Sequence, residues 1–253
     1  MRTERADFTG GQGALLGGRL DLPDEGEPRA YAIFAHCFGC TKNLKTIGFL
    51  DRSLTDAGIA VLRFDFTGLG DSEGVFADTN FTSNVDDIVA AASYLAEHRT
   101  APTLLIGHSL GGAAVMQAAR SIESVAAVVA IAAPADLGHL GETIVRHAPD
   151  LEQRGEAEVT LAGRRFYIKQ QFIDDLERGS MAQIVGSLDR PLLILHAPAD
   201  KIVPIASAEH IYDLARQPKS LIALDGADHL LLNQEDAAYA GSLIASWFGR
   251  YLS

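Results

Sequence analysis

The sequence predicts an α/β domain built on a mostly parallel, eight-stranded sheet. Short apolar runs alternate with longer segments of helical period, the pattern of buried parallel strands joined by helices. At 253 residues, 47% of them hydrophobic, the chain suits one large domain, 1–253. A domain of this size buries about three quarters of its unfolded surface. We therefore expect a single sheet with helices on both faces.

The first two strands are predicted as an antiparallel hairpin. Residues 4–9 and 13–22 flank Gly10-Gly11-Gln12, and a polar loop follows at 23–28. The second strand of the sheet is thus antiparallel. Six more strands are predicted in the apolar runs 30–35, 60–64, 103–106, 126–132, 192–195 and 219–224.

Helices are predicted between these strands, at 44–57, 84–98, 110–122, 205–215 and 233–251. The stretch 135–190 has no obvious core strand and is too long for an ordinary connection. We interpret it as a small cap inserted after the sixth strand, with a hairpin at 157–168 and a helix at 169–177. Its position places it on the side where open α/β sheets carry their sites.

A nucleophile-elbow motif lies between the strand at 103–106 and the following helix. Residues 107–112 read Gly-His-Ser-Leu-Gly-Gly, which is the pattern Gly-x-Ser-x-Gly in a strand-turn-helix context. Glycines flank Ser109 because strand and helix nearly touch there. We predict Ser109 as a nucleophile.

A serine nucleophile needs a general base and a group that orients the base. In this architecture the acid follows the seventh strand and the histidine follows the eighth. Asp200 and His229 occupy loops at these two positions. Asp225 and Asp228 lie too close to His229 in sequence to reach its ring, and Asp189 precedes the seventh strand.

Seven other histidines compete with His229. Four of them fall on presumed helices or on the cap, where a packed or solvated histidine is the usual explanation. His36, His108 and His196 lie near strand ends, where we expect each to orient a loop rather than to take the proton.

An oxyanion hole needs two backbone N–H groups. One belongs to the residue after the nucleophile, Leu110, and the other to the loop after the third strand, which reads His36-Cys37-Phe38-Gly39-Cys40. This loop resembles the His-Gly-x-Gly turn of serine esterases in the α/β-hydrolase superfamily, with Cys37 where glycine is common. The resemblance assigns the second N–H to Phe38.

Further motifs support the resemblance. Residues 63–72 are similar to the Arg-x-Asp-x-x-Gly-x-Gly-x-Ser turn that follows the fourth strand in many such hydrolases. Together with the stretches 79–81, 84–87 and 155–158, they resemble the esterase-like domains that occur fused to OsmC-type peroxidase domains. The resemblance covers essentially the whole chain and implies an α/β-hydrolase fold. No peroxidase domain follows Ser253, so we expect a free-standing relative or an isolated domain.

Cys37 and Cys40 form a C-x-x-C pair. Such a pair can be a redox couple or half of a metal site, or can simply pack the loop. A structural zinc wants four ligands, and only His36 stands close by in sequence, so we expect no metal. We hypothesise that oxidation of the pair disturbs the Phe38 N–H and lowers activity.

The net charge of −12 argues against nucleic acid or an anionic membrane as a partner. No apolar run approaches 18 residues, and the N-terminus lacks the apolar stretch of a signal peptide. Two cysteines do not make a disulfide framework. We therefore expect a cytoplasmic protein.

The reaction that these residues predict is hydrolysis of carboxylic esters with small to medium acyl chains, without a cofactor. Candidate substrate-binding residues are His36, Cys37 and His108, with Phe166 and Phe172 of the cap, although the cap aromatics are as well explained by the cap's own core. A thioesterase, a peptidase or a C–C bond hydrolase could use the same triad. The remaining alternative is a regulatory or binding partner of a peroxidase. We expect either a homodimer or a domain linked to an OsmC-type domain.

Overall fold

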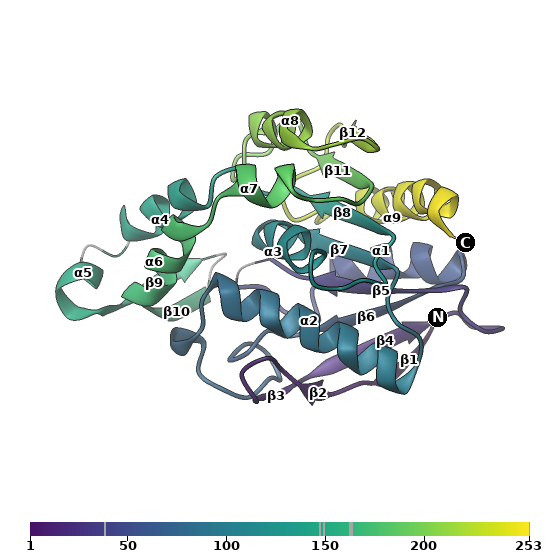
Figure 1. Ribbon diagram of the computed structural model, residues 1–253, viewed down its shortest axis with the longest axis horizontal. Coiled ribbons are helices and arrows are strands. Elements are labelled where there is room, and N and C mark those ends of the chain that lie inside the picture. The colour runs from purple at the N-terminus through teal and green to yellow at the C-terminus, as the bar shows by residue number, and fades with distance from the viewer. Residues whose placement is uncertain (38, 147, 149, 162–163, 253) are drawn as a thin grey trace.

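The computed structural model describes residues 1–37, 39–146, 148, 150–161 and 164–252, and within them one eight-stranded sheet forms the centre (Figure 1). In chain order its strands are β1 (Arg2–Arg5), β4 (Gly18–Leu22), β5 (Ala30–Ala35), β6 (Ile59–Phe64), β7 (Leu104–His108), β8 (Ala127–Ile131), β11 (Leu192–His196) and β12 (Lys219–Ala223). Their order in space is β1-β4-β6-β5-β7-β8-β11-β12. Strand β4 is antiparallel to both neighbours and the six strands from β5 onward are parallel, as predicted.

The predicted N-terminal hairpin is split into two pairings. Strand β1 pairs with β4, whereas the short strands β2 (Phe8–Thr9) and β3 (Leu15–Leu16) pair with each other in a separate sheet. The split lies at Gly18, where an added Cβ would come within 2.1 Å of the Ala6 carbonyl oxygen. This close approach lets the backbone cross from one pairing to the other.

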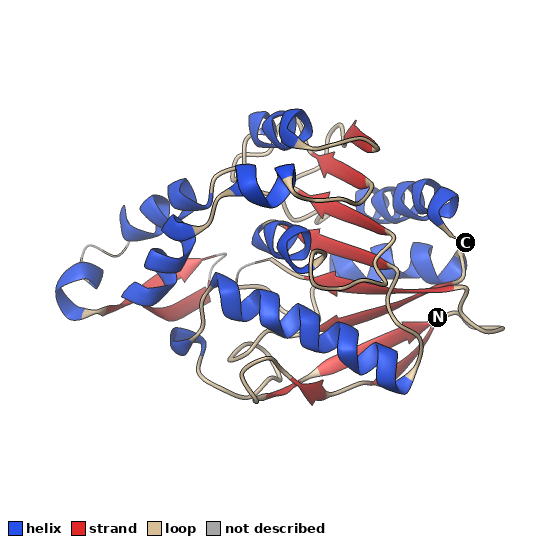
Figure 2. Cartoon of the chain, in the orientation of Figure 1, coloured by secondary structure: helices blue, strands red, loops and turns tan. Residues whose placement is uncertain are grey.

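Helices cover both faces of the sheet (Figures 1 and 2). One face carries α2 (Phe81–His98), α3 (Leu110–Ala118), α7 (Met181–Gly186) and α8 (Ile205–Leu214), and the other carries α1 (Lys45–Asp56) and α9 (Gln234–Phe248). The central strands alternate their side chains between two apolar cores, so that every residue of β5, β6 and β7 is buried. Burial on both faces explains why these strands read as continuous apolar runs.

Helix α2 begins three residues before its predicted start at 84. The side chain of Asn80 accepts a hydrogen bond from the Ser83 N–H at 2.8 Å, and the Asn80 N–H donates to the Ser83 hydroxyl at 2.9 Å. This capping box uses serine where glutamate is usual, so the pattern was not recognised in the sequence.

The stretch 135–190 lies between β8 and β11, the sixth and seventh strands of the sheet. Its elements are α4 (Leu137–Arg146), α5 (Leu151–Arg154), β9 (Glu156–Leu161), β10 (Arg164–Lys169), α6 (Gln170–Arg178) and α7. Strands β9 and β10 form the predicted hairpin, and its predicted turn at 162–163 lies outside the described residues. Helix α6 matches the predicted helix at 169–177, and α4 is an element that the sequence reading missed.

Most of this segment extends from the end of the sheet opposite the two termini (Figure 1). Asp175 on α6 accepts hydrogen bonds from the N–H and the hydroxyl of Thr82 at the start of α2, at 2.7 and 3.0 Å. Lys169 forms an ion pair with Asp78. The rings of Phe166 and Phe76 pack with centroids 5.3 Å apart. These contacts fasten the segment to the first half of the chain.

The motif at 63–72 builds a buried cluster of charges after β6. The Asp65 carboxylate accepts from the N–H of Lys42 at 2.7 Å, from its ammonium at 2.5 Å and from the Asp71 N–H at 2.9 Å. Arg63 pairs with Asp21 at 2.7 Å and with Asp51 at 3.0 Å. Gly70 has a φ of 53°, and an added Cβ would stand 2.1 Å from Asp65 Oδ2. The glycine therefore makes room for the buried carboxylate.

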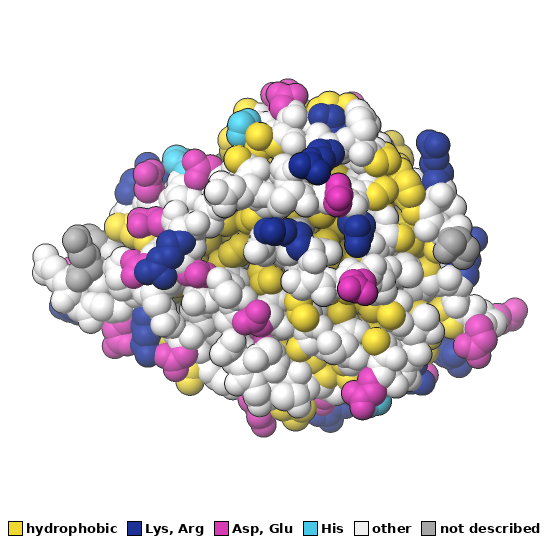
Figure 3. All heavy atoms as spheres, viewed as in Figure 1, with side chains coloured by type: hydrophobic (Ala, Val, Ile, Leu, Met, Phe, Trp, Pro, Cys, Tyr) yellow, Lys and Arg dark blue, Asp and Glu magenta, His cyan; other side chains and the backbone are white. Residues whose placement is uncertain are grey.

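Charged side chains of both signs are interspersed over the face that carries α2 and α7 (Figure 3). Within the described part of the chain, no helix is both long enough and apolar enough to cross a bilayer.

Candidate active site

Ser109 stands at a strained turn between β7 and α3. Its φ of 55° and ψ of −124° lie in a region that costs a residue other than glycine about 1–3 kcal/mol. The Ser109 N–H donates to the Ile131 carbonyl at 2.8 Å, which fixes the turn against β8. A Cβ at Gly107 would stand 2.2 Å from the Gly111 carbonyl, and one at Gly111 would stand 2.4 Å from the Ala35 carbonyl. The glycines of the motif therefore permit the close approach that the serine turn requires.

The predicted acid and base are in direct contact. His229 Nδ1 lies 2.7 Å from Asp200 Oδ2, and the other Asp200 oxygen accepts from the N–H groups of Ile202 and Val203 at 2.8 and 3.0 Å. Burial by itself raises the pKa of the Asp200 carboxyl, but the hydrogen bonds from His229, Val203 and Ile202 outweigh it and lower that pKa. A charged Asp200 accepts from a protonated Nδ1, which leaves His229 Nε2 as the nitrogen available to a substrate or a serine.

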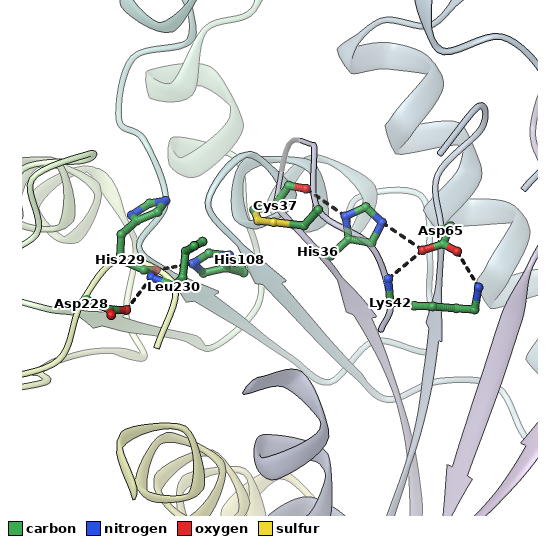
Figure 4. Close-up of a disulfide and its surroundings, with 9 residues drawn as sticks. His36, Cys37, Lys42, Asp65, His108, Asp228, His229 and Leu230 are labelled. Atoms are coloured by element: carbon green, nitrogen blue, oxygen red, sulfur yellow. Dashed lines mark hydrogen bonds and ion pairs between the residues drawn. A yellow bond between two sulfur atoms is a disulfide. The ribbon is translucent and has the colours of Figure 1, made fainter. Parts of the chain in front are cut away.

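His108 links the loop that carries His229 to the strand that precedes Ser109. The His108 ring lies 5.1 Å from the His229 ring between centroids, and its Nε2 is 2.6 Å from the His229 carbonyl oxygen (Figure 4). Since His108 directly precedes Ser109, the base loop rests on the strand that carries the serine. Burial, with a smaller contribution from His229, lowers the pKa of His108 to about 3, so this ring is neutral.

The loop after β5 contains a disulfide between Cys37 and Cys40, with Cα atoms 5.3 Å apart (Figure 4). The Cys37 carbonyl accepts from the Cys40 N–H at 3.0 Å and from His36 Nδ1 at 2.9 Å. His36 Nε2 is 3.9 Å from Asp65 Oδ1, which links this loop to the buried charge cluster. The predicted donor Phe38 lies outside the described residues, so its role stays a prediction.

Leu110, the other predicted oxyanion donor, is the first residue of α3. The N–H groups of a helix's first turn have no partner inside the helix, and the dipole makes this end electropositive. The Leu110 N–H is therefore in a suitable position to stabilise a negative oxygen next to Ser109.

Ser109 borders a cavity of about 310 Å³. The walls come from α4 with the residues that precede it, from β9, and from the loop after Asp200 with the start of α8. Of the described lining residues none is Lys or Arg, and most are apolar. The lining residues are Ser109, Pro134, Ala135, Asp136, His139, Leu140, Thr143, Ile144, Thr160, Ile202, Val203, Pro204 and Ser207.

The predicted substrate-binding residues are placed differently. Phe172 is 1% exposed and packs near Phe76 with ring centroids 6.3 Å apart, and Phe166 also contacts Phe76. His36, Cys37 and His108 are buried. Among the described residues that line the cavity beside Ser109, none of these five is present. The described residues likewise contain no group of three or more His, Cys, Asp or Glu arranged for a metal ion.

Comparison with known proteins identifies the family. The sequence profile of the alpha/beta hydrolase family matches residues 32–241. This chain belongs to the alpha/beta hydrolase family. The predicted α/β-hydrolase fold is thus confirmed, with its mostly parallel sheet and helices on both sides.

Individual members of the alpha/beta hydrolase family are also similar to this chain. The crystal structure of the esterase domain from a Rhodothermus marinus protein is 47% identical, covers 100% of both chains and superposes with a TM-score of 0.83. The uncharacterised protein YfhR of Salmonella typhimurium is 26% identical over 90% of this chain and 74% of its own. The mitochondrial palmitoyl-protein thioesterase of Mus musculus is 30% identical over 71% of this chain and 62% of its own.

Most of the cavity wall was missed in the sequence. Helix α4 supplies Leu140 and Ile144, and the acid loop supplies Ile202 and Val203. Ile202 is 71% exposed and lies two residues after the predicted acid. The sequence does contain one signal for this wall: the apolar run Ile-Val-Pro at 202–204, in a loop at the carboxyl end of a strand.

Proposed function

We propose that this chain is a serine hydrolase that cleaves carboxylic esters of small to medium acyl chains through an acyl-enzyme on Ser109. The observation that carries the proposal is the strained turn that displays Ser109 on the wall of an apolar cavity, together with the hydrogen-bonded pair His229 and Asp200, whose loop is bound to the neighbouring His108. The similarity to an esterase domain at 47% identity supports it.

In the proposed first step, the Ser109 hydroxyl attacks the ester carbonyl while His229 Nε2 takes its proton. Asp200 holds the imidazole through Nδ1 and stabilises the imidazolium that forms. The tetrahedral oxygen accepts from the Leu110 N–H and from the second donor that we assign to Phe38. Collapse of this intermediate releases the alcohol, which takes the proton from His229.

In the second step water replaces the alcohol. His229 takes a proton from the attacking water, the second tetrahedral intermediate forms on the acyl carbon, and Ser109 leaves with a proton from His229. Carboxylic acid and free enzyme result. The cycle consumes one water per ester and needs no cofactor.

The cavity supports an uncharged acyl or alcohol group. Its volume of about 310 Å³ is in the range of pockets that bind small molecules. The described lining contains one carboxylate, Asp136, and no Lys or Arg that could pair with a carboxylate or phosphate on the substrate. We therefore expect neutral esters to be better substrates than esters that carry an anion in this group.

A thioesterase is the second candidate, favoured by the similarity to the palmitoyl-protein thioesterase. The same triad serves both reactions. Turnover of an oxygen ester and a thioester with the same acyl group distinguishes them.

The disulfide between Cys37 and Cys40 bears on the cellular location. Disulfides are more usual in oxidising compartments than in the cytoplasm. The cytoplasmic location therefore stays a prediction.

Covalent labelling by a serine-directed fluorophosphonate tests the proposal. We expect stoichiometric labelling of the wild type, none of Ser109→Ala, and full labelling of Ser93→Ala, which changes an exposed serine on α2. A wild type that neither reacts nor hydrolyses p-nitrophenyl butyrate contradicts the enzyme assignment and favours a binding role.

A further inference from the structure

Two buried histidines beside the proposed site take no part in the proton transfers described above. His108 is the last residue of β7 and His196 the last residue of β11. Their exposed fractions are 6% and 0%. A buried imidazole loses its hydration, so its ring nitrogens need partners within the protein. What they contact indicates what they do.

His108 holds the loop that carries the base. Its Nε2 is 2.6 Å from the His229 carbonyl oxygen. Because a carbonyl only accepts, His108 Nε2 must carry the hydrogen, and a neutral ring then leaves Nδ1 unprotonated. The surroundings keep the ring neutral, since it also borders a small cavity lined by the side chains of Phe34, Leu44, Ile47 and Leu230. Burial lowers the pKa of His108 to about 3.

His196 holds the acid loop in the same way. Its Nε2 is 2.8 Å from the Val203 carbonyl oxygen, and the N–H of Val203 donates to Asp200 Oδ1 at 3.0 Å. His196 Nε2 is also 3.6 Å from Asp200 Oδ2. His108 at the end of β7 thus donates to a carbonyl in the loop of the proposed base, and His196 at the end of β11 donates to a carbonyl in the loop of the proposed acid.

The base depends more on such support than the acid does. Asp200 accepts hydrogen bonds from two backbone N–H groups, whereas among the described residues the ring of His229 has one hydrogen bond, to Asp200. A ring held at one nitrogen can pivot about that bond unless its backbone is fixed. The His108 bond fixes the backbone at His229 itself, 121 residues away in sequence.

We infer that His108 is a positioning residue of the hydrolase, whose Nε2–H holds the backbone of His229 so that the imidazole meets Ser109. This inference rests on the proposed function. It differs from a purely structural role because loss of the hydrogen bond should slow proton transfer more than it weakens substrate binding. A displacement of about 1 Å at a reacting group can cost about 100-fold in rate.

Three variants separate the hydrogen bond from the packing. His108→Leu fills the site without a donor, and His108→Gln restores an N–H donor on a side chain of similar length. His210→Leu removes an exposed histidine on α8 and serves as the control. We expect His108→Leu to lower kcat about 10- to 100-fold with KM nearly unchanged. His108→Gln should recover most of that loss, and the control should match the wild type.

Thermal unfolding of each variant shows whether it is folded under the assay conditions. If His108→Leu does not fold, two measurements still test the inference. The kinetics of His108→Gln are compared with those of the wild type, and the protonation of the His108 ring is measured by NMR in the wild-type protein. The expected state is a His108 ring protonated at Nε2 and unprotonated at Nδ1, with ring shifts that do not change between pH 5 and 8. A ring that titrates in this range, or one protonated at Nδ1, overturns the inference.

Two kinetic outcomes also overturn it. One is equal activity of His108→Leu and the wild type, and the other is a loss that His108→Gln shares in full or that falls on KM alone. Failure of the proposed function looks different, because the wild type itself would then show neither turnover nor fluorophosphonate labelling.

Discussion

Two buried aspartates occupy equivalent places in this fold and have different partners. Asp65 follows β6 and Asp200 lies in the loop after β11, both at the carboxyl ends of parallel strands. Asp65 is surrounded by Lys42 and backbone N–H groups, while Asp200 combines two backbone N–H groups with the imidazole of His229. Both carboxylates are fully satisfied, so burial does not distinguish them. A lysine partner fixes a loop, whereas a histidine partner can exchange a proton.

The same substitution at both positions should therefore affect different properties. Asp200→Asn keeps an oxygen for the N–H groups of Ile202 and Val203 but turns an amide toward His229 and favours the wrong tautomer. We expect kcat/KM for p-nitrophenyl butyrate to fall about 10⁴-fold with little change in thermal stability. A fall of less than tenfold would contradict the assignment of Asp200.

Asp65→Asn should instead lower stability. It leaves the buried ammonium of Lys42 without its main counter-ion, and breaking a buried pair costs about 3–5 kcal/mol. We expect the melting temperature to drop by about 6–20 °C, with kcat within a few-fold of wild type. Asp189→Asn is the control, since that carboxylate is 80% exposed and its pair contributes less than about 1 kcal/mol. A stable Asp65→Asn with lost activity would reverse the comparison.

Gly70→Ala tests whether crowding against Asp65 matters beyond backbone strain. The added methyl would collide with the carboxylate, and φ is positive as well, so we expect a loss of about 2 kcal/mol or more. Gly26 also has a positive φ, 75°, but open space around it. Gly26→Ala should therefore cost only about 1 kcal/mol. Denaturant unfolding measures both, and equal losses would mean that the Asp65 contact is unimportant.

The disulfide sharpens the comparison because His36 connects Cys37 to Asp65. The bonded form has two hydrogen bonds to the Cys37 carbonyl. The hypothesis that oxidation lowers activity stays a prediction, because it concerns the N–H of Phe38, which lies outside the described residues. The opposite effect follows if the disulfide holds the loop in its active form. We expect reduction, or Cys40→Ser, to lower kcat about 3- to 10-fold, less than deletion of an oxyanion donor costs. Thiol titration alongside turnover measures this effect. Higher activity in the reduced form would support the original hypothesis.

Asp51 gives the smallest expected effect. Burial raises the pKa of its carboxyl well above the usual range, although Arg63 opposes this. A raised pKa in the folded state favours folding below the unfolded-state value of about 4, and this contribution is lost as the pH rises through the folded-state pKa. Asp51→Asn should thus be at least as stable as wild type at pH 7, with the difference vanishing near pH 4. A loss of stability at pH 7 would show that the charged form is needed.

The nucleophile, base and acid that we propose each have a local signal in the sequence. Ser109 lies in a motif whose glycines have a steric reason, and His229 and Asp200 follow apolar runs that end at the same edge of the sheet. The contact between His108 and the His229 carbonyl has no such signal, since it joins backbone and side chain across the fold. Helix α4 was not predicted, because in the stretch 135–190 the sequence analysis identified only a hairpin and the helix at 169–177. The residues of α4 that line the cavity were therefore not predicted either.

The aromatic residues of the inserted segment show that residue type alone does not predict which side chains line a pocket. Phe166 and Phe172 were candidates for the pocket because they are large and apolar, yet a small subdomain needs such residues for its own packing. The structure places both against Phe76. Sequence alone cannot separate a pocket wall from a core when both want the same side chains.

Trapping of the acyl-enzyme tests the central claim most directly. The wild type is mixed with p-nitrophenyl butyrate, quenched in acid within the first turnover and examined by intact-protein mass spectrometry with peptide mapping. We predict one butyryl group per chain, located on Ser109, and none on Ser109→Ala. Turnover without any acyl-enzyme, or a butyryl group on another residue, would contradict the account.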